Sequence, residues 1–178
     1  MKKVIILGNS GSGKSTLAKQ FESEGLAHLD LDTIAWDLTP SPIRKPLEES
    51  EQQILSFMSA HSSWVIEGCY ADLLDICTQY ANQAIFMDLE VSACIKNAES
   101  RPWEPHKYPS KEAQDKNLAM LIEWISQYPI RTDTFSRQAH QGLYEKFAGD
   151  KTRIVENSDL NTVFPNSHNW NKSRSSLE

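Results

Sequence analysis

The chain has 178 residues, of which 39% are hydrophobic, and it carries a formal net charge of −6. This length and composition are typical of one globular domain with a substantial core. The negative charge argues against a general nucleic-acid-binding surface, which requires a basic face, so binding to DNA is not expected.

The cysteines and the first residues bear on where the protein is found. Cys69, Cys77 and Cys94 form no Cys-x-x-Cys pair, and any disulfide scheme leaves one of them over. This favours reduced thiols in the cytoplasm. The opening "MKKVIILG" is similar to a signal peptide, but its apolar run ends after four residues at a polar, glycine-rich turn. No stretch reaches the length needed to cross a membrane. We therefore expect a cytoplasmic protein without a membrane span. A monomer and a homodimer are both left open.

Short apolar runs alternate with helical patterns along the chain. The runs predict five buried parallel strands, and three amphipathic helical patterns accompany them. The strands are expected at residues 4–7, 26–29, 64–66, 84–87 and 153–155, and the helical patterns at 47–58, 118–125 and 140–147. Gly149 follows the last pattern and is a plausible helix cap. The alternation predicts an α/β fold whose parallel sheet is covered on both faces.

Two segments with three prolines each interrupt this alternation, "DLTPSPIRKP" at residues 37–46 and "RPWEPHKYP" at residues 101–109. Proline fits neither a helix interior nor a central strand, so both segments are predicted to be loops. Each follows a strand-and-helix unit, where loops that close over ligands lie. Plain surface connectors remain an equal alternative.

A phosphate-binding motif follows the first predicted strand. It fits G-x-x-x-x-G-K-[ST], the Walker A motif or P-loop, at every position. The glycines let the backbone turn and direct successive N–H groups into one concavity, and the start of the next helix favours phosphate. Lys14 can reach the β- and γ-phosphates, and the Ser15 hydroxyl can bind Mg²⁺. The residues predicted to bind a nucleoside triphosphate are Gly8, Asn9, Ser10, Gly11, Ser12, Gly13, Lys14, Ser15 and Thr16.

Further motifs narrow the class of P-loop protein. GTPases read guanine with N/T-K-x-D, and the nearest match, at residues 171–174, has Arg where Asp is needed. The LSGGQ-like signature of transporter ATPases is absent. With about 160 residues after the loop, the chain fits a compact small-molecule kinase better than a motor.

Carboxylates follow three of the predicted strands. Asp30 and Asp32 end the second strand, Glu67 ends the third and Asp88 ends the fourth. Since the carboxyl ends of parallel strands share one edge of the sheet, these acids should converge near the P-loop. Carboxylates there can hold Mg²⁺ or accept the proton of a hydroxyl group. Each acid alone is also suited to capping the next helix.

Four segments of the chain resemble adenylate-kinase-related P-loop proteins labelled DNA topology modulation proteins, within the nucleoside- and shikimate-kinase-like group. These segments are "GNSGSGKSTLAKQF", "HLDLDTIAW", "WVIEGCY" and "IFMDLE", and the resemblance covers residues 1–157. It implies a three-layer α/β/α P-loop NTPase fold with a five-stranded parallel sheet in the order 2-3-1-4-5. It also implies ATP and Mg²⁺ as ligands. The expected organisation is one domain over residues 1–165, a helical lid insertion at about 101–132 and a flexible tail at 166–178.

The resemblance also implies roles for the carboxylates. By analogy with the Asp-x-Asp of shikimate kinases, Asp30 would help to hold Mg²⁺ through water, and Asp32 would take the proton of the acceptor hydroxyl. Glu67 follows the strand that should neighbour the P-loop strand, so it is assigned to the Walker B position. Ser15, Asp30 and Glu67 are thus the expected metal site. Asp88 is a weaker candidate and suits a helix cap equally well.

The lid of the family supplies cations to the γ-phosphoryl group and excludes water. Arg101, Arg131 and Arg137 are the candidates, although each alone fits a solvated surface arginine equally well. Trp103 either covers the nucleotide or packs, and Trp36 either lines the acceptor pocket or lies in the core. His140 lies on an apolar helical face and is expected to pack.

Departures from the known kinases concern the acceptor. Adenylate kinases have D-G-F-P-R after the third strand, where this chain has "EGCYA", so the arginine for an acceptor phosphate is absent there. The carboxylates would also repel a phosphate, at about 4 kcal/mol per unpaired contact near 4 Å, unless Arg44 and Lys45 offset them. We expect a phosphotransferase for a small neutral or cationic hydroxyl compound. A nucleotide-binding regulator with little or no kinase activity is the alternative.

Overall fold

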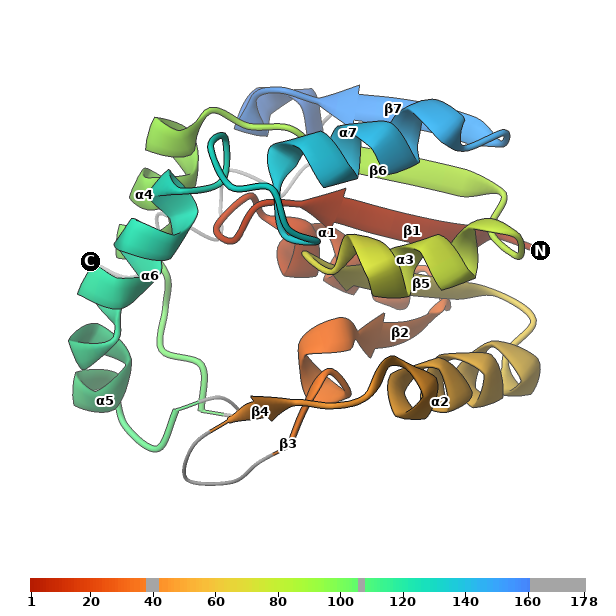
Figure 1. The fold of residues 1–178 in the computed structure, drawn as a ribbon, viewed down its shortest axis with the longest axis horizontal. Coiled ribbons are helices and arrows are strands. Elements are labelled where there is room, and N and C mark those ends of the chain that lie inside the picture. Colours follow the sequence, from red (N-terminus) through yellow and green to blue (C-terminus); the bar gives the residue numbers. More distant parts are fainter. Residues whose placement is uncertain (38–41, 106–107, 161–178) are drawn as a thin grey trace.

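A computed structural model describes residues 1–37, 42–105 and 108–160. Its centre is a five-stranded, fully parallel sheet in the order β2-β5-β1-β6-β7 (Figure 1). Counted along the sheet's own strands, this is the expected order 2-3-1-4-5, and the numbering differs only because an unpredicted two-stranded ribbon, β3–β4, comes between. The strands are β1 Lys3–Gly8, β2 Ala27–Asp30, β3 Trp36–Asp37, β4 Ile43–Arg44, β5 Trp64–Gly68, β6 Gln83–Met87 and β7 Asp150–Ile154.

Helices cover both faces of the sheet, as the run of apolar residues in the central strands requires. In β1, Ile5 and Leu7 pack with α2, α3 and α7, while Val4 and Ile6 pack with α1, α4 and α6. The α-helices are α1 Lys14–Ser23, α2 Leu47–Ala60, α3 Ala71–Thr78, α4 Val91–Glu99, α5 Lys111–Lys116, α6 Leu118–Ser126 and α7 Arg137–Lys146, and short 3₁₀ turns are η1 Leu31–Thr33 and η2 Asn157–Asp159. The α/β fold with a parallel sheet covered on both faces, which the alternation predicted, and the three-layer arrangement that the resemblance implied are therefore confirmed.

Strand pairing brings the chemically interesting ends together. Glu67 on β5 is in register with Ile6 on β1 and with Asp30 on β2, and Gly8 is in register with Met87 on β6. Because all five strands run in the same direction, their carboxyl ends form one edge of the sheet, from which the P-loop emerges. The helices α4, α5 and α6 lie beside this edge, at the left of Figure 1.

The segment expected to form a lid contains two helices, α5 and α6. Before them, the described residues of the second proline-rich segment contain neither helix nor strand, as predicted. The first proline-rich segment contributes one residue to β3 and both residues of β4, which is Ile43–Arg44. The lid boundaries stay a prediction, and the expected tail at residues 166–178 lies outside the described residues.

The predicted cap of α7 is wrong. The helix ends at Lys146, and Phe147 follows with φ −62° and ψ 129°, which leaves the helical region. Gly149 has a different purpose, because a Cβ there would lie 2.7 Å from the carbonyl oxygen of Asn82. Its missing side chain lets the chain pass close to the start of β6 before it enters β7. In the part of the chain that the structure describes, no helix is both long and apolar enough to span a membrane.

Candidate active site

The loop between β1 and α1 has the backbone that phosphate binding requires. Gly11 has φ +74°, and a Cβ there would lie 2.4 Å from the carbonyl oxygen of Cys94 on α4. A Cβ on Gly8 would similarly lie 2.5 Å from the carbonyl oxygen of Met87. Only glycine fits at these two positions, because any side chain would collide with rigid backbone. The loop is thus shaped by contact with β6 and α4 as well as by its own sequence.

Two asparagine side chains hold the loop from outside. Asn9 is buried, and its amide donates to the carbonyl oxygen of Ile125 at the end of α6 (3.1 Å). Asn97 on α4 donates to the carbonyl oxygen of Gly11 (2.9 Å). Asn97 is held in turn by Asn157, whose side-chain amide donates to the side-chain oxygen of Asn97 (3.1 Å). The sequence indicated that Asn9 belongs to the loop but not that its side chain fixes α6.

Lys14 and Ser12 carry the clearest chemical signals. The Lys14 ammonium is buried and donates to the carbonyl oxygen of Asn9 (2.8 Å), so the P-loop lysine lies folded over its own loop. The Ser12 hydroxyl is fully buried and has no hydrogen-bond partner among the described residues. Buried polar groups in native proteins are almost always paired, so an unpaired hydroxyl two residues before a buried lysine in the same loop fits a bound anion. Ser15 is half-buried in the first turn of α1, and Thr16 is exposed.

Glu67 occupies a buried position beside the P-loop strand. Its side chain is 2% exposed, its Oε1 has no hydrogen-bond partner in the described residues, and it lies 3.7 Å from Nε2 of His28. Burial acts to lower the pKa of His28, but the neighbouring carboxylates of Glu67, Asp30 and Glu22 raise it above its ordinary value overall. His28 was not predicted from the sequence, although it precedes Asp30 by two residues and so lies on the same face of β2.

Asp30 takes a structural contact that the sequence left as an alternative. Its Oδ1 accepts a hydrogen bond from the backbone N–H of Asp32 (2.9 Å), and it caps the 3₁₀ turn η1. Its register opposite Glu67 nevertheless puts two carboxylates on the same face of neighbouring strands. Within the described residues, no group of three or more His, Cys, Asp or Glu side chains is arranged to hold a metal ion. Mg²⁺ usually needs only one or two carboxylates, together with water and phosphate oxygens, so the residues present fit this ion.

Asp32 is exposed on η1, and a buried tyrosine binds it. The phenolic hydroxyl of Tyr70 donates to Asp32 Oδ1 (2.6 Å), and the indole N–H of Trp36 donates to the Tyr70 oxygen (2.7 Å). Trp36 is half-buried, packs against the core, and is joined to Asp32 through the Tyr70 hydroxyl. Nearby, burial raises the pKa of the Cys69 thiol to about 12. The thiol therefore stays protonated and is a poor nucleophile.

Asp88 does not cap the helix after it. The residue before α4 is Glu90, which makes no side-chain cap, whereas Asp88 is bound by two arginines. Arg137 forms two hydrogen bonds of 2.8 Å with its two oxygens, and Arg153 on β7 donates to Oδ2. Burial acts to raise the pKa of Asp88, but these hydrogen bonds and charges hold it below its ordinary value. The carboxylate therefore fastens α7 and β7 to the end of β6.

The candidate lid arginines each have a carboxylate partner of their own. Arg101 pairs with Glu104 (3.1 Å), and Arg131 pairs with Asp133 (2.7 Å) while its guanidinium lies 3.7 Å from the ring centre of Trp124. Arg137 is the arginine bound to Asp88. The structure does not place these three guanidinium groups around one point, and their part in catalysis stays a prediction.

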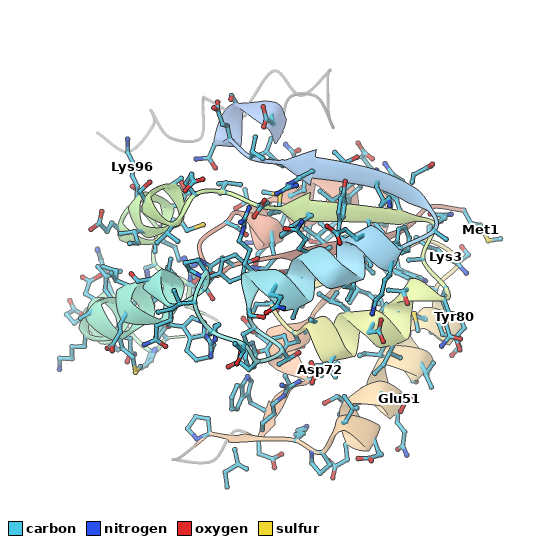
Figure 2. The ribbon with its side chains drawn as sticks, turned by 45° about the horizontal axis from the view of Figure 1, so that its top comes forward. Met1, Lys3, Glu51, Asp72, Tyr80 and Lys96 are labelled. Atoms are coloured by element: carbon cyan, nitrogen blue, oxygen red, sulfur yellow. The ribbon has the colours of Figure 1, made fainter. Side chains whose placement is uncertain are left out.

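Arg44 has a partner that the sequence did not suggest. It contacts both oxygens of Asp72 (2.9 and 2.8 Å), which lies at the start of α3 (Figure 2). Its guanidinium also lies 5.2 Å from the ring centre of Tyr70 and 5.3 Å from that of Phe135. The Arg44 charge is thus compensated inside the protein.

His140 and Trp103 behave as packing residues. His140 is fully buried and lies between the hydroxyl of Tyr128 (2.8 Å from Nδ1) and the carbonyl oxygen of Cys69 (2.9 Å from Nε2). Burial lowers its pKa to about 4, so the ring is neutral at pH 7. Trp103 is 45% exposed, and its N–H donates to the carbonyl oxygen of Tyr108 (3.1 Å).

Comparison with known proteins places the fold. No family model matches the sequence, and no curated protein matches it either, so the narrower resemblance to DNA topology modulation proteins is not confirmed. Among solved structures, the chain is similar to TT1252 from Thermus thermophilus, at 14% identity over 92% of this chain and 95% of that one, with a TM-score of 0.52. It is also similar to a deoxyadenosine kinase from M. mycoides with bound dATP, at 10% identity over 93% and 98% of the two chains, with a TM-score of 0.50. Together with the Walker A loop, these likenesses define a P-loop protein with a kinase-like fold.

Proposed function

We propose that this protein is an ATP- and Mg²⁺-dependent phosphotransferase that acts on a small hydroxyl compound without a phosphate group. The observation that carries the proposal is the loop of residues 8–15, where Lys14 and the unpaired Ser12 hydroxyl are buried within one turn of backbone. The P-loop has no group that can take the proton of the acceptor. The carboxylate of Asp32, at the same edge of the sheet, supplies that group.

The nucleotide site follows from the loop. Backbone N–H groups of residues 8–15 would bind the β- and γ-phosphates, and Lys14 would exchange its bond with Asn9 for one with a phosphate oxygen. Ser15, Asp30 and Glu67 are the residues that would hold Mg²⁺, with water between. When bound, that ion would neutralise charge on the β- and γ-phosphates.

In the reaction, the acceptor oxygen forms a bond to the γ-phosphorus as the bond between that phosphorus and the β-phosphate oxygen breaks. The acceptor's proton passes to the carboxylate of Asp32, and ADP leaves with the electron pair of the broken bond. Arg101 and Arg131 would have to leave Glu104 and Asp133 to reach the transferred group. Each carboxylate lies two or three residues from its arginine in the sequence.

The charge around the acceptor position favours a substrate without phosphate. Arg44 is one of the two cations expected to offset the carboxylates there, and both oxygens of Asp72 already bind it. Asp30, Asp32 and Glu67 place three carboxylates in this region, with His28 beside Glu67. A phosphate that meets one carboxylate at 4 Å without a compensating cation costs about 4 kcal/mol. Neutral or cationic hydroxyl compounds meet no such cost.

The test is ADP release from Mg–ATP in the presence of a panel of nucleosides, sugars, cyclic polyols and amino alcohols. Lys14→Ala should abolish release with any acceptor that the wild type uses, and Lys19→Ala, an exposed position on the same helix, should not. An unchanged rate in Lys14→Ala would overturn the assignment of the loop. Tight ATP binding without release on the whole panel would instead favour a nucleotide-binding regulator.

A further inference from the structure

A line of three hydrogen-bonding side chains leads from the core to the proposed base. The indole N–H of Trp36 donates to the oxygen of Tyr70, and the hydroxyl of Tyr70 donates to Oδ1 of Asp32, over 2.7 and 2.6 Å respectively. The three residues come from different places, β3, the turn before α3, and η1. Each hydrogen bond is therefore a tertiary contact, and the direction of donation is fixed because an indole N–H cannot accept.

The middle member of this line is firmly held. Tyr70 is 3% exposed, and its ring lies edge-on to Phe135, with ring centres 5.2 Å apart. The guanidinium of Arg44 lies over the same ring. Burial and the negative charge of Asp32 together keep the pKa of Tyr70 far above its ordinary value, so the phenol retains its proton and acts as a donor.

The proposed base lies at the surface. Asp32 is an exposed residue on the three-residue 3₁₀ turn η1. A base contributes to catalysis only if it is held within hydrogen-bond reach of the proton that it takes. The hydrogen bond from the buried phenol of Tyr70 to one carboxylate oxygen restricts the orientation of the Asp32 side chain.

We infer that Tyr70 is a positioning residue that orients the Asp32 carboxylate for the acceptor hydroxyl, and that Trp36 in turn orients the Tyr70 hydroxyl. This inference rests on the proposed function, because it gives Tyr70 a role only in the transfer step. It predicts an effect on kcat that is separate from nucleotide binding and from stability.

The variant to test is Tyr70→Phe, which removes the hydroxyl and keeps the ring. The matched control is Tyr128→Phe, because Tyr128 is also buried, at 2% exposed, and its hydroxyl bonds a core histidine at 2.8 Å. Kinetics are measured with Mg–ATP and an acceptor from the panel above. In Tyr70→Phe, kcat should fall about tenfold with KM for ATP unchanged. Tyr128→Phe should lose comparable stability to urea and keep its kcat.

A double-mutant cycle completes the test. In an Asp32→Asn background, Tyr70→Phe should have no further effect on kcat, because the group that it orients no longer accepts a proton. Equal falls in kcat in both backgrounds, or in Tyr70→Phe and Tyr128→Phe alike, would overturn the positioning role while leaving the proposed function intact. A wild-type protein that transfers phosphate to no member of the panel would overturn both.

Discussion

The side-chain amide of Asn9 donates a hydrogen bond to the backbone carbonyl of Ile125, which lies 116 residues further along the chain (3.1 Å). This contact joins the second residue of the P-loop to the end of α6, inside the segment expected to form a lid. It is buried, so its loss leaves polar groups without water to replace the partner.

We expect Asn9→Ala to lower the free energy of unfolding by about 1–2 kcal/mol, since one buried hydrogen bond is lost and a small space is opened. Urea unfolding followed by tryptophan fluorescence measures the change. Ser10→Ala, at the next position and only half-buried, should cost less. Equal stability of Asn9→Ala and the wild type would show that α6 is held by other contacts.

The backbone of the loop gives a second prediction. Gly11→Ala should abolish ATP binding in calorimetry, because its Cβ would need to lie 2.4 Å from the Cys94 carbonyl oxygen at φ +74°. Gly142→Ala is the control, since that glycine lies inside α7 and a Cβ there meets no atom within 4 Å. It should bind ATP normally and gain about 0.5–1 kcal/mol of stability. Normal binding by Gly11→Ala would contradict the proposed cradle.

The Asp88 ion-pair cluster should contribute measurably to stability. Asp88→Asn leaves Arg137 and Arg153 without a buried counter-charge, but both arginines are close to half exposed and water can solvate them. We therefore expect a loss of about 2 kcal/mol, below the usual range for fully buried pairs. Asp115→Asn, which breaks an exposed pair with Lys111, should cost less than about 0.5 kcal/mol. Similar losses in the two variants would contradict this ranking.

Because the pKa of Asp88 is lower in the folded protein than its ordinary value, its stabilising effect is present above that ordinary value. It is lost as the pH falls through the lowered folded value. The difference in unfolding free energy between wild type and Asp88→Asn should therefore shrink in strong acid.

His140 predicts a pH effect in a milder range. Burial lowers its pKa to about 4 in the folded protein from 6.5, so between these values the unfolded chain binds a proton that the folded chain excludes. Stability should therefore fall as the pH drops from about 6.5 to 4, by up to about 1.4 kcal/mol per pH unit from this group.

The measurement is urea unfolding at a series of pH values for the wild type and His140→Gln. The variant's stability should depend less on pH in this window, whatever its absolute stability. His61→Gln removes an exposed histidine and should keep the wild-type slope. An unaltered slope in His140→Gln would show that the ring titrates normally.

The sequence predicted those parts of the structure that depend on nearby residues. The strands and the two covered faces of the sheet were predicted from apolar runs of strand length, since a strand buried on both faces needs little besides them. The strand order was predicted only from the resemblance to P-loop kinases. The P-loop followed from glycines and a lysine within eight residues, a local pattern whose geometry the chain confirms at Gly8 and Gly11. The position of Asp30 and Glu67 at one edge of the sheet was predicted from the common direction of parallel strands.

The sequence could not predict which side chains form hydrogen bonds and ion pairs with residues far away in the chain. Arg137 was only a candidate for a lid cation, yet it binds Asp88, which lies 49 residues earlier. Likewise, Tyr70 reaches Asp32 across 38 residues. Such pairs depend on how helices pack on the sheet, and no spacing rule along the chain describes that. His28 could have been found, because alternation along β2 places it on the face of Asp30.

Three contacts with the rest of the fold hold the P-loop in shape. Gly8 lies against β6, Gly11 lies against α4, and Asn9 is hydrogen-bonded to the end of α6. A peptide with the motif alone would lack all three supports, so the motif is not a portable module. Nucleotide affinity in this protein should therefore report on the entire tertiary structure. On heating, binding of a nucleoside triphosphate and the circular dichroism of the sheet should disappear in one transition.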